Sequence, residues 1–151
     1  MVNTFLPHSS FNISATVLDK KRLGKQRVET LQILKANLGL TTGWVNHPAA
    51  VMWRGYNESL AAYGLIVCRV WIGYGYKDTC EEKIDQLMPG LKKEIFSKPL
   101  ADVVNLPPWV GNPAFHDSHR SNLLRKDPEF YGKYGWSVPN DLPYLWPVSK
   151  E

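Results

Sequence analysis

The sequence feature that most constrains the fold is the stretch from Asp19 to Leu38, DKKRLGKQRVETLQILKANL, which has the hydrophobic spacing of a helix. One side of that helix carries four leucines, at Leu23, Leu31, Leu34 and Leu38. The opposite side carries polar residues at spacings of three and four, namely Arg22, Lys25, Gln26, Glu29 and Gln32. This pattern predicts an amphipathic helix over 19–38. Glu29 is the single acid on its otherwise basic face.

The length and charge of the chain set broad limits on its class. At 151 residues the chain is predicted to form one domain, residues 1–151, with enough chain to bury a core. The net charge of +4 suits a phosphate-bearing partner, although a modest basic excess is common in soluble proteins. The longest apolar run, Leu60–Ile72, is interrupted by a glycine and an arginine, so no membrane span is expected. Cys68 and Cys80 form no CxxC motif, which favours reduced thiols and a cytoplasmic, intracellular location.

Helical spacing continues through most of the chain, and no segment shows the sustained alternation of a β-strand. Further helices are expected at Ala49–Trp71, from Asp78 or Thr79 to Leu87, at Leu91–Phe96 and at Ala114–Arg125. The proline-rich stretch Pro99–Pro113 is expected to be a loop that wraps the core. The predicted fold is all-α: a single compact domain of several helices, with an extended N-terminal arm over residues 1–19 and an aromatic, proline-rich C-terminal tail from residue 128.

Two histidines mark the late helical segment AFHDSHRSNLLR, residues 114–125. His116 and His119 are three residues apart, but this spacing identifies no third or fourth ligand, so no metal site is expected. Together with Arg120 and Lys126, the histidines suggest a surface that contacts phosphates. The alternative is an ordinary solvated helix with capped ends.

Several aromatic residues, and Arg54, could either bind DNA or serve an ordinary structural role. Tyr131 and Tyr134 are candidates for stacking on exposed bases, whereas Trp136 and Trp146 are expected to pack the tail onto the domain. Trp53 is expected in the core because the residues around it in the sequence are mostly apolar. Arg54 is a candidate phosphate contact, with a plain surface charge as the alternative.

Five short segments also occur in a familiar order: RLGKQRVE (22–29), NHP (46–48), GYGYKDT (73–79), FHDSH (115–119) and PEFYGKYG (128–135). In this order and spacing, which covers most of the chain, they resemble the pyrimidine-dimer DNA glycosylase family, which includes the phage endonuclease V repair enzymes. None of the segments is specific by itself. The first of them ends in Glu29, at the position of the family's catalytic glutamate.

The resemblance implies a helical enzyme whose N-terminal amine attacks C1′ of a damaged nucleotide, with a glutamate beside it. Val2 is a small second residue that permits removal of Met1, and its α-amine would then be the nucleophile beside Glu29. The implied activity is that of a DNA glycosylase with associated abasic-site lyase (β-elimination) activity on a damaged or modified pyrimidine. We expect a monomer acting on double-stranded DNA without a cofactor. By its spacing alone, Glu29 would be a solvated helix charge paired with Lys25.

The residues expected to contact DNA come from the first long helix, the middle of the chain and the late segments. They are Arg22, Lys25, Gln26, Arg54, His116, His119, Arg120, Lys126, Tyr131 and Tyr134. Arg27 lies toward the leucine side of its helix and is the weakest of the basic candidates.

The sequence departs from the phage repair enzymes close to the expected site. Val28 and Gln32 stand where those enzymes have arginines, and Val2 stands in place of a threonine. These departures favour an enzyme that keeps the amine and glutamate but acts on another lesion. Two alternatives stay open: a DNA-binding helical protein with no chemistry, and an enzyme that removes or exchanges an undamaged modified base.

Overall fold

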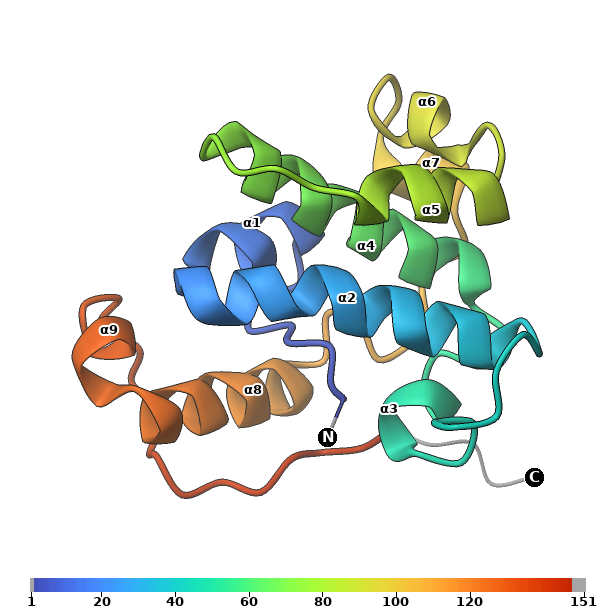
Figure 1. Ribbon diagram of the computed structural model, residues 1–151. Coiled ribbons are helices and arrows are strands. Elements are labelled where there is room, and N and C mark those ends of the chain that lie inside the picture. Colours follow the sequence, from blue (N-terminus) through green and yellow to red (C-terminus); the bar gives the residue numbers. More distant parts are fainter. Residues whose placement is uncertain (1, 148–151) are drawn as a thin grey trace.

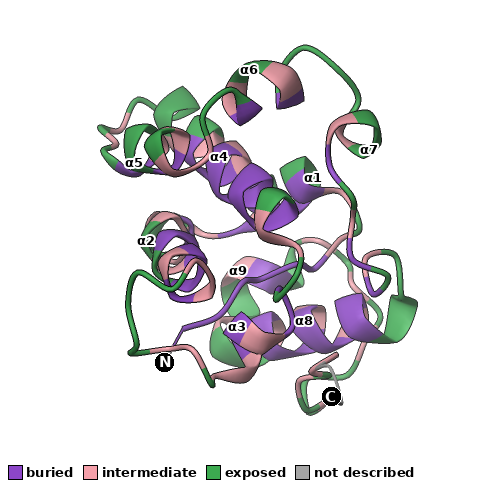
Figure 2. Cartoon of the chain, turned by 90° about the vertical axis from the view of Figure 1, so that its right-hand side faces the viewer, coloured by how far each residue is buried: buried purple, intermediate pink, exposed green. Residues whose placement is uncertain are grey.

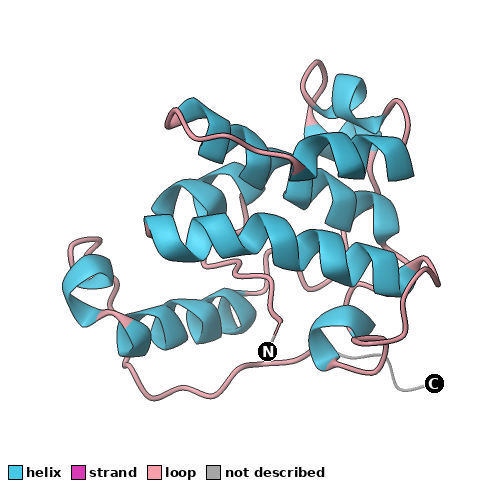
Figure 3. Ribbon diagram, viewed as in Figure 1, coloured by secondary structure: helices cyan, strands magenta, loops and turns pink. Residues whose placement is uncertain are grey.

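The computed structural model describes residues 2–147, and within this range every regular element is a helix (Figure 3). The helices are α1 (Phe11–Val17), α2 (Lys20–Asn37), α3 (Pro48–Val51), α4 (Asn57–Gly73), α5 (Cys80–Leu87), α6 (Leu91–Ile95), α7 (Leu100–Val103), α8 (Pro113–Lys126) and α9 (Pro128–Gly132). The predicted all-α fold is confirmed. Met1, whose removal the expected chemistry requires, and residues 148–151 of the tail lie outside the described residues.

Helix α2 forms where the sequence predicts it and organises its neighbours. Asp19 caps its first turn by accepting a hydrogen bond from the Arg22 backbone N–H. The apolar side of α2 packs against α4, whose inner side is almost wholly buried (Figure 2). The two helices approach closely at Gly64, because a Cβ atom at this position would lie 2.8 Å from the Thr30 side chain. This close approach fixes the polar side of α2 on the outside of the core.

The central helix expected over Ala49–Trp71 is instead two helices, α3 and α4, separated by a turn. Gly55 in this turn has a φ of +86°, a left-handed conformation that glycine adopts without steric cost. Trp53, just before the break, is fully buried, and its indole N–H donates to Thr4 Oγ1 at 2.9 Å. The prediction that Trp53 belongs to the core is confirmed.

The N-terminal arm differs from the extended stretch that the sequence suggests. Residues 11–17 form helix α1, which Ser10 caps by accepting a hydrogen bond from the Ile13 backbone N–H. Residues 2–6 have no regular secondary structure and run between α2 and α8 (Figure 1). All five are buried, and Val2 is only 2% exposed. The arm is therefore part of the core.

The later part of the chain returns to this arm. Helix α8 agrees with its predicted range, whereas the predicted loop over 99–113 contains the short helix α7. After α9 the tail runs back along α8 toward the N-terminal arm (Figure 1). Ser121 and Ser118 on α8 accept hydrogen bonds from the backbone N–H groups of Leu142 and Leu145, at 2.9 and 3.2 Å. The tail is thus fixed to α8 by its own backbone.

Two predictions from composition are tested by the same structure. Cys68 and Cys80 are both buried and both free. None of the helices in the described part of the chain is long and apolar enough to cross a membrane.

Candidate functional site

Glu29 lines a pocket of about 220 Å³ where the N-terminal arm, α2, the end of α8 and the tail meet. The residues that line it are Asn3, Phe5, Lys21, Arg22, Lys25, Glu29, Lys126 and Tyr144. Glu29 is the one acid among these residues, and four of the others are cations. The pocket therefore combines a single carboxylate with a positive surround.

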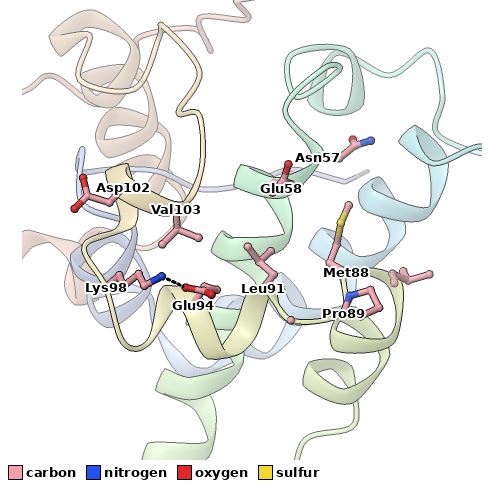
Figure 4. Close-up of a pocket in the computed structure, with 11 residues that line it drawn as sticks. Asn57, Glu58, Met88, Pro89, Leu91, Glu94, Lys98, Asp102 and Val103 are labelled. Carbon is pink, nitrogen blue, oxygen red and sulfur yellow. Dashed lines mark ion pairs between the residues drawn. The ribbon is translucent and has the colours of Figure 1, made fainter.

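A larger pocket, of about 780 Å³, lies elsewhere, between the start of α4 and helices α5, α6 and α7 (Figure 4). Its lining is mainly apolar and acidic: Met88 and Leu91 lie with Glu58 and Glu94, and Glu94 is paired with Lys98 at 2.6 Å. None of the residues predicted to act on DNA lines this pocket. The smaller pocket is the candidate functional site because of its chemistry, despite its size.

The Glu29 carboxyl group is partly withdrawn from water. Burial raises its pKa, while the Lys25 ammonium group and a hydrogen bond from the Asn3 backbone N–H oppose that rise. A carboxyl group with a raised pKa can take up and return a proton closer to neutral pH than an exposed one. Asn3 lines the same pocket as Glu29, so the carboxyl group lies close to the residue that follows Val2.

Three of the predicted DNA contacts, Arg22, Lys25 and Lys126, are brought together in this pocket. Arg22 is also paired with Asp19 at 3.1 Å, which offsets part of its charge. Lys21 completes the cluster and was not singled out from the sequence, although the run of basic residues at 20–22 was visible there. These four side chains could bind the phosphates that flank a reacting nucleotide.

Gln26 does not lie on the exposed face where the helical pattern placed it. It is fully buried, its side-chain N–H donates to the Asn3 carbonyl oxygen, and its Oε1 accepts from the Phe5 N–H, both at 2.7 Å. Because an extended arm leaves its backbone groups without helical partners, a buried amide on α2 satisfies them. Gln26 therefore holds the arm against the helix that carries Glu29, and its burial leaves it without access to DNA.

His116 and His119 are likewise buried rather than exposed to DNA. His119 Nδ1 accepts from the Leu6 N–H at 3.0 Å, and His116 Nδ1 lies 2.7 Å from the Leu6 carbonyl oxygen. His116 Nε2 accepts from the Gly111 N–H, so its Nδ1 carries the proton and donates to Leu6. Burial lowers the pKa of His119 to about 3, which keeps the ring neutral. Both rings clamp the arm from the side of α8.

Two predicted arginine contacts lie outside the pocket lining. Arg120 donates through Nε to the Pro7 carbonyl oxygen at 2.7 Å and is paired with Asp117 at 3.4 Å, so it too holds the arm. Arg54 is exposed in the turn before α4 and donates to the Val45 carbonyl oxygen. Neither residue lines the pocket that contains Glu29.

The two tyrosines proposed to stack on bases are used in packing. Tyr131 is buried, and its hydroxyl group donates to the Asp19 carboxylate and accepts from the Asp19 backbone N–H. The Tyr134 hydroxyl group donates to the Val17 carbonyl oxygen at 3.0 Å. Trp136 stacks on both rings, as expected of a structural aromatic residue. These contacts join α9 and the tail to the junction of α1 and α2.

Three further lining residues were not identified from the sequence: Asn3 and Phe5 on the arm, and Tyr144 on the tail. Tyr144 packs edge-on against the His119 ring, with centroids 5.5 Å apart, and burial raises the pKa of its phenol. No spacing pattern could have placed Tyr144 here, because its position depends on the path of an irregular tail. Among the described residues, no group of three or more His, Cys, Asp or Glu side chains could hold a metal ion.

Comparison with known families gives one match. A family model described as pyrimidine dimer DNA glycosylase matches residues 2–84, which include the arm, α2 and Glu29. Lys126 and Tyr144 lie beyond the matched range. No curated protein and no solved structure matches the chain.

Proposed function

This chain belongs to the pyrimidine dimer DNA glycosylase family, and from that premise we propose that the α-amine of Val2, freed by removal of Met1, is the nucleophile of a glycosylase that also cleaves abasic sites. The amine attacks C1′ of the nucleotide, and Glu29 assists beside it. Loss of the base gives an imine between the sugar and the protein, from which the strand is cut by β-elimination.

The observation that carries this proposal is that Asn3, the residue after Val2, lines the same pocket as Glu29, with its backbone N–H facing the Glu29 carboxyl group. Consecutive residues have Cα atoms about 3.8 Å apart, so the nitrogen of Val2 is a near neighbour of the same carboxyl group. Gln26, about one turn before Glu29 on α2, holds the arm next to Glu29 through its bonds to Asn3 and Phe5. A nucleophile and a proton carrier are thereby supported by one rigid helix.

The electrostatics of the pocket suit both groups. Lys21, Lys25 and their basic neighbours repel an ammonium group, which favours the neutral, nucleophilic form of the amine. Glu29 in its charged form would stabilise the positive sugar in the transition state, and in its protonated form it would supply a proton as the sugar ring opens. Burial raises the pKa of Glu29, which makes its protonated form easier to reach than that of an exposed carboxyl group.

Duplex DNA must be deformed before C1′ becomes accessible, and cationic groups at the phosphates stabilise a bent duplex with an extruded nucleotide. Arg22, Lys25, Lys21 and Lys126 supply such groups around the pocket. A second candidate substrate, an altered single pyrimidine, is favoured by the exposed and uncharged Val28, which with Gln32 lines a hollow on the other side of Glu29.

Borohydride trapping on a duplex with one abasic site tests the proposal. The wild-type protein should form a covalent adduct, and chemical blocking of the α-amine should abolish it. Intact mass should show that Met1 is removed. Glu29→Gln should bind the duplex with nearly unchanged affinity but lose turnover, while the matched control Glu129→Gln on α9 should keep both. Retained DNA binding without any adduct would instead support a protein that binds DNA without chemistry.

A further inference from the structure

The side chain of Asn3 is unusual among the groups that line the pocket. Asn3 is 4% exposed, its backbone N–H faces the Glu29 carboxyl group, and its carbonyl oxygen accepts from Gln26. Its side-chain Oδ1 accepts from the Thr4 backbone N–H at 2.8 Å.

The fourth group, the Asn3 amide nitrogen Nδ2, is buried and has no hydrogen-bond partner in the described part of the chain. The amide orientation is fixed, because the Thr4 N–H can bond only to an oxygen. The Asn3 side chain also faces the Tyr144 hydroxyl group, whose pKa it lowers against the effect of burial, but Nδ2 does not reach hydrogen-bonding geometry there. A buried donor without a partner is costly, which points to a ligand that supplies the missing acceptor.

The position of this donor relative to the expected chemistry defines the acceptor. Asn3 follows Val2 in the chain and lines the pocket together with Glu29, so we infer that its amide lies beside the place where C1′ would react. A phosphate oxygen would be drawn to the four cations of the pocket instead. A neutral amide suits a neutral carbonyl oxygen that gains charge during the reaction. Every pyrimidine base has such an oxygen, O2, on the carbon next to the glycosidic nitrogen N1.

Resting on the function proposed above, we propose that Asn3 is a further catalytic residue, whose Nδ2 donates a hydrogen bond to O2 of the departing pyrimidine. As the amine lone pair forms the bond to C1′, the C1′–N1 bond breaks and its electron pair leaves on the base, shared between N1 and O2. The Asn3 donor stabilises this charge. One proton of the attacking nitrogen passes through Glu29 and ends on the departed base, which balances the step.

This role separates two reactions of the same pocket. Cleavage of the glycosidic bond needs the Asn3 donor, whereas β-elimination at a preformed abasic site has no leaving base. Asn3→Ala and Asn3→Leu should both slow single-turnover cleavage of a duplex with one thymine dimer by about 100-fold, the usual effect of removing one such donor. Nicking and borohydride trapping on the matching abasic duplex should stay within a few-fold of wild type. The wild-type rate should also fall when O2 is replaced by sulfur, a weaker acceptor.

The matched control is Asn37→Leu, which removes a half-buried amide at the end of α2 that donates to the Ala50 carbonyl oxygen, away from the pocket. It should leave the ratio of the two rates unchanged. Equal losses of both reactions in the Asn3 variants would overturn the inference, because Asn3 would then only position the arm. Full glycosidic cleavage in either variant would overturn it as well. A wild-type protein that gives no adduct on abasic DNA would instead refute the proposed function itself, and this inference with it.

Discussion

Glu29 shows at the scale of a single residue how a useful group can be unfavourable for stability. Its carboxyl group is partly buried in the pocket, and this burial raises its pKa from a reference value of 4.5. The Lys25 ammonium group and the Asn3 N–H offset only part of this rise in pKa. Above the raised pKa, the folded protein therefore carries a charge that the unfolded chain accommodates more easily.

Glu29→Gln should accordingly stabilise the fold while it abolishes turnover. The increase in the free energy of unfolding should be present at pH 7.5. It should vanish as the pH falls below 4.5, because the carboxyl group is then protonated in both folded and unfolded states. Thermal unfolding of both proteins at pH 4 and 7.5 measures it. The control Glu94→Gln should show the opposite sign, since Lys98 lowers the pKa of that exposed carboxyl group. A Glu29→Gln variant that is less stable than the wild type at pH 7.5 would contradict this account.

His119 gives the fold a second dependence on pH, of a different sign. Burial lowers its pKa to about 3 from 6.5, so protons bind to the unfolded chain first as the pH falls. The free energy of unfolding should fall between pH 6.5 and 3, by up to about 1.4 kcal/mol per pH unit for this group. His119→Asn keeps an acceptor for the Leu6 N–H but cannot be protonated. Urea unfolding at several pH values should show a shallower dependence for the variant; parallel curves would refute the role of His119.

The sequence indicated the acid of the pocket more readily than the residues that hold the arm. Glu29 could be singled out because a lone acid on a basic helix face is visible in the spacing, and the structure places it in a pocket lined by cations. Gln26 and His119 were assigned to the surface because polar side chains are usually exposed. Their true partners are backbone groups of Phe5 and Leu6, which no periodic pattern reveals.

At the scale of elements, the arm is held by side chains instead of by a helix or a sheet. Gln26 on α2, His116 on α8 and Tyr63 on α4 each bond to a backbone group of the arm. Three helices thus fix one irregular segment. This arrangement explains how a segment without regular secondary structure is held in one position.

Gln26→Glu tests this anchoring with the smallest change of shape. The variant keeps an acceptor for the Phe5 N–H but turns an oxygen toward the Asn3 carbonyl oxygen, which should cost about 1–3 kcal/mol of stability at pH 7. Lowering the pH should reduce the difference in stability between the variant and the wild type, because a protonated glutamate restores the donor. Urea unfolding at pH 4.5 and 7 measures both effects. Gln32→Glu, on the exposed side of the same helix, should cost much less. An equal cost for the two variants would refute the anchoring role.

Elements with regular spacing could be predicted from the sequence, whereas helices α1 and α7 and the break before α4 could not. Helices α2, α5 and α8 have regular spacing and recognisable ends, so their ranges agree with expectation. Helix α1 is only seven residues long and contains Ile13, Thr16 and Val17, whose branched side chains disfavour helices. The break at Gly55 was missed because a single glycine is often tolerated within a helix.

At the scale of the whole molecule, the two pockets carry opposite charge: one is lined mainly by basic side chains and the other by acidic ones. The pocket around Glu29 gathers four cations from α2 and α8. The pocket between α4 and α7 presents Glu58, Glu94 and Asp102 with a single lysine (Figure 4). A duplex should therefore be attracted to the first and repelled by the second. The net charge of +4 conceals this asymmetry, which only the fold creates.

DNA affinity should consequently depend on salt through the Glu29 pocket alone. If its four cations each neutralise a phosphate, the logarithm of the association constant should fall with the logarithm of salt concentration with a slope of about −3.6. Arg22 is paired with Asp19, so a slope nearer about −2.7 is expected if it contributes little. Lys126→Gln should reduce the slope by about 1, uniformly across DNA sequences. Lys98→Gln in the acidic pocket should leave it unchanged. Fluorescence anisotropy on one duplex over a range of salt concentrations measures all three, and an unchanged slope in Lys126→Gln would show that the phosphates bind elsewhere.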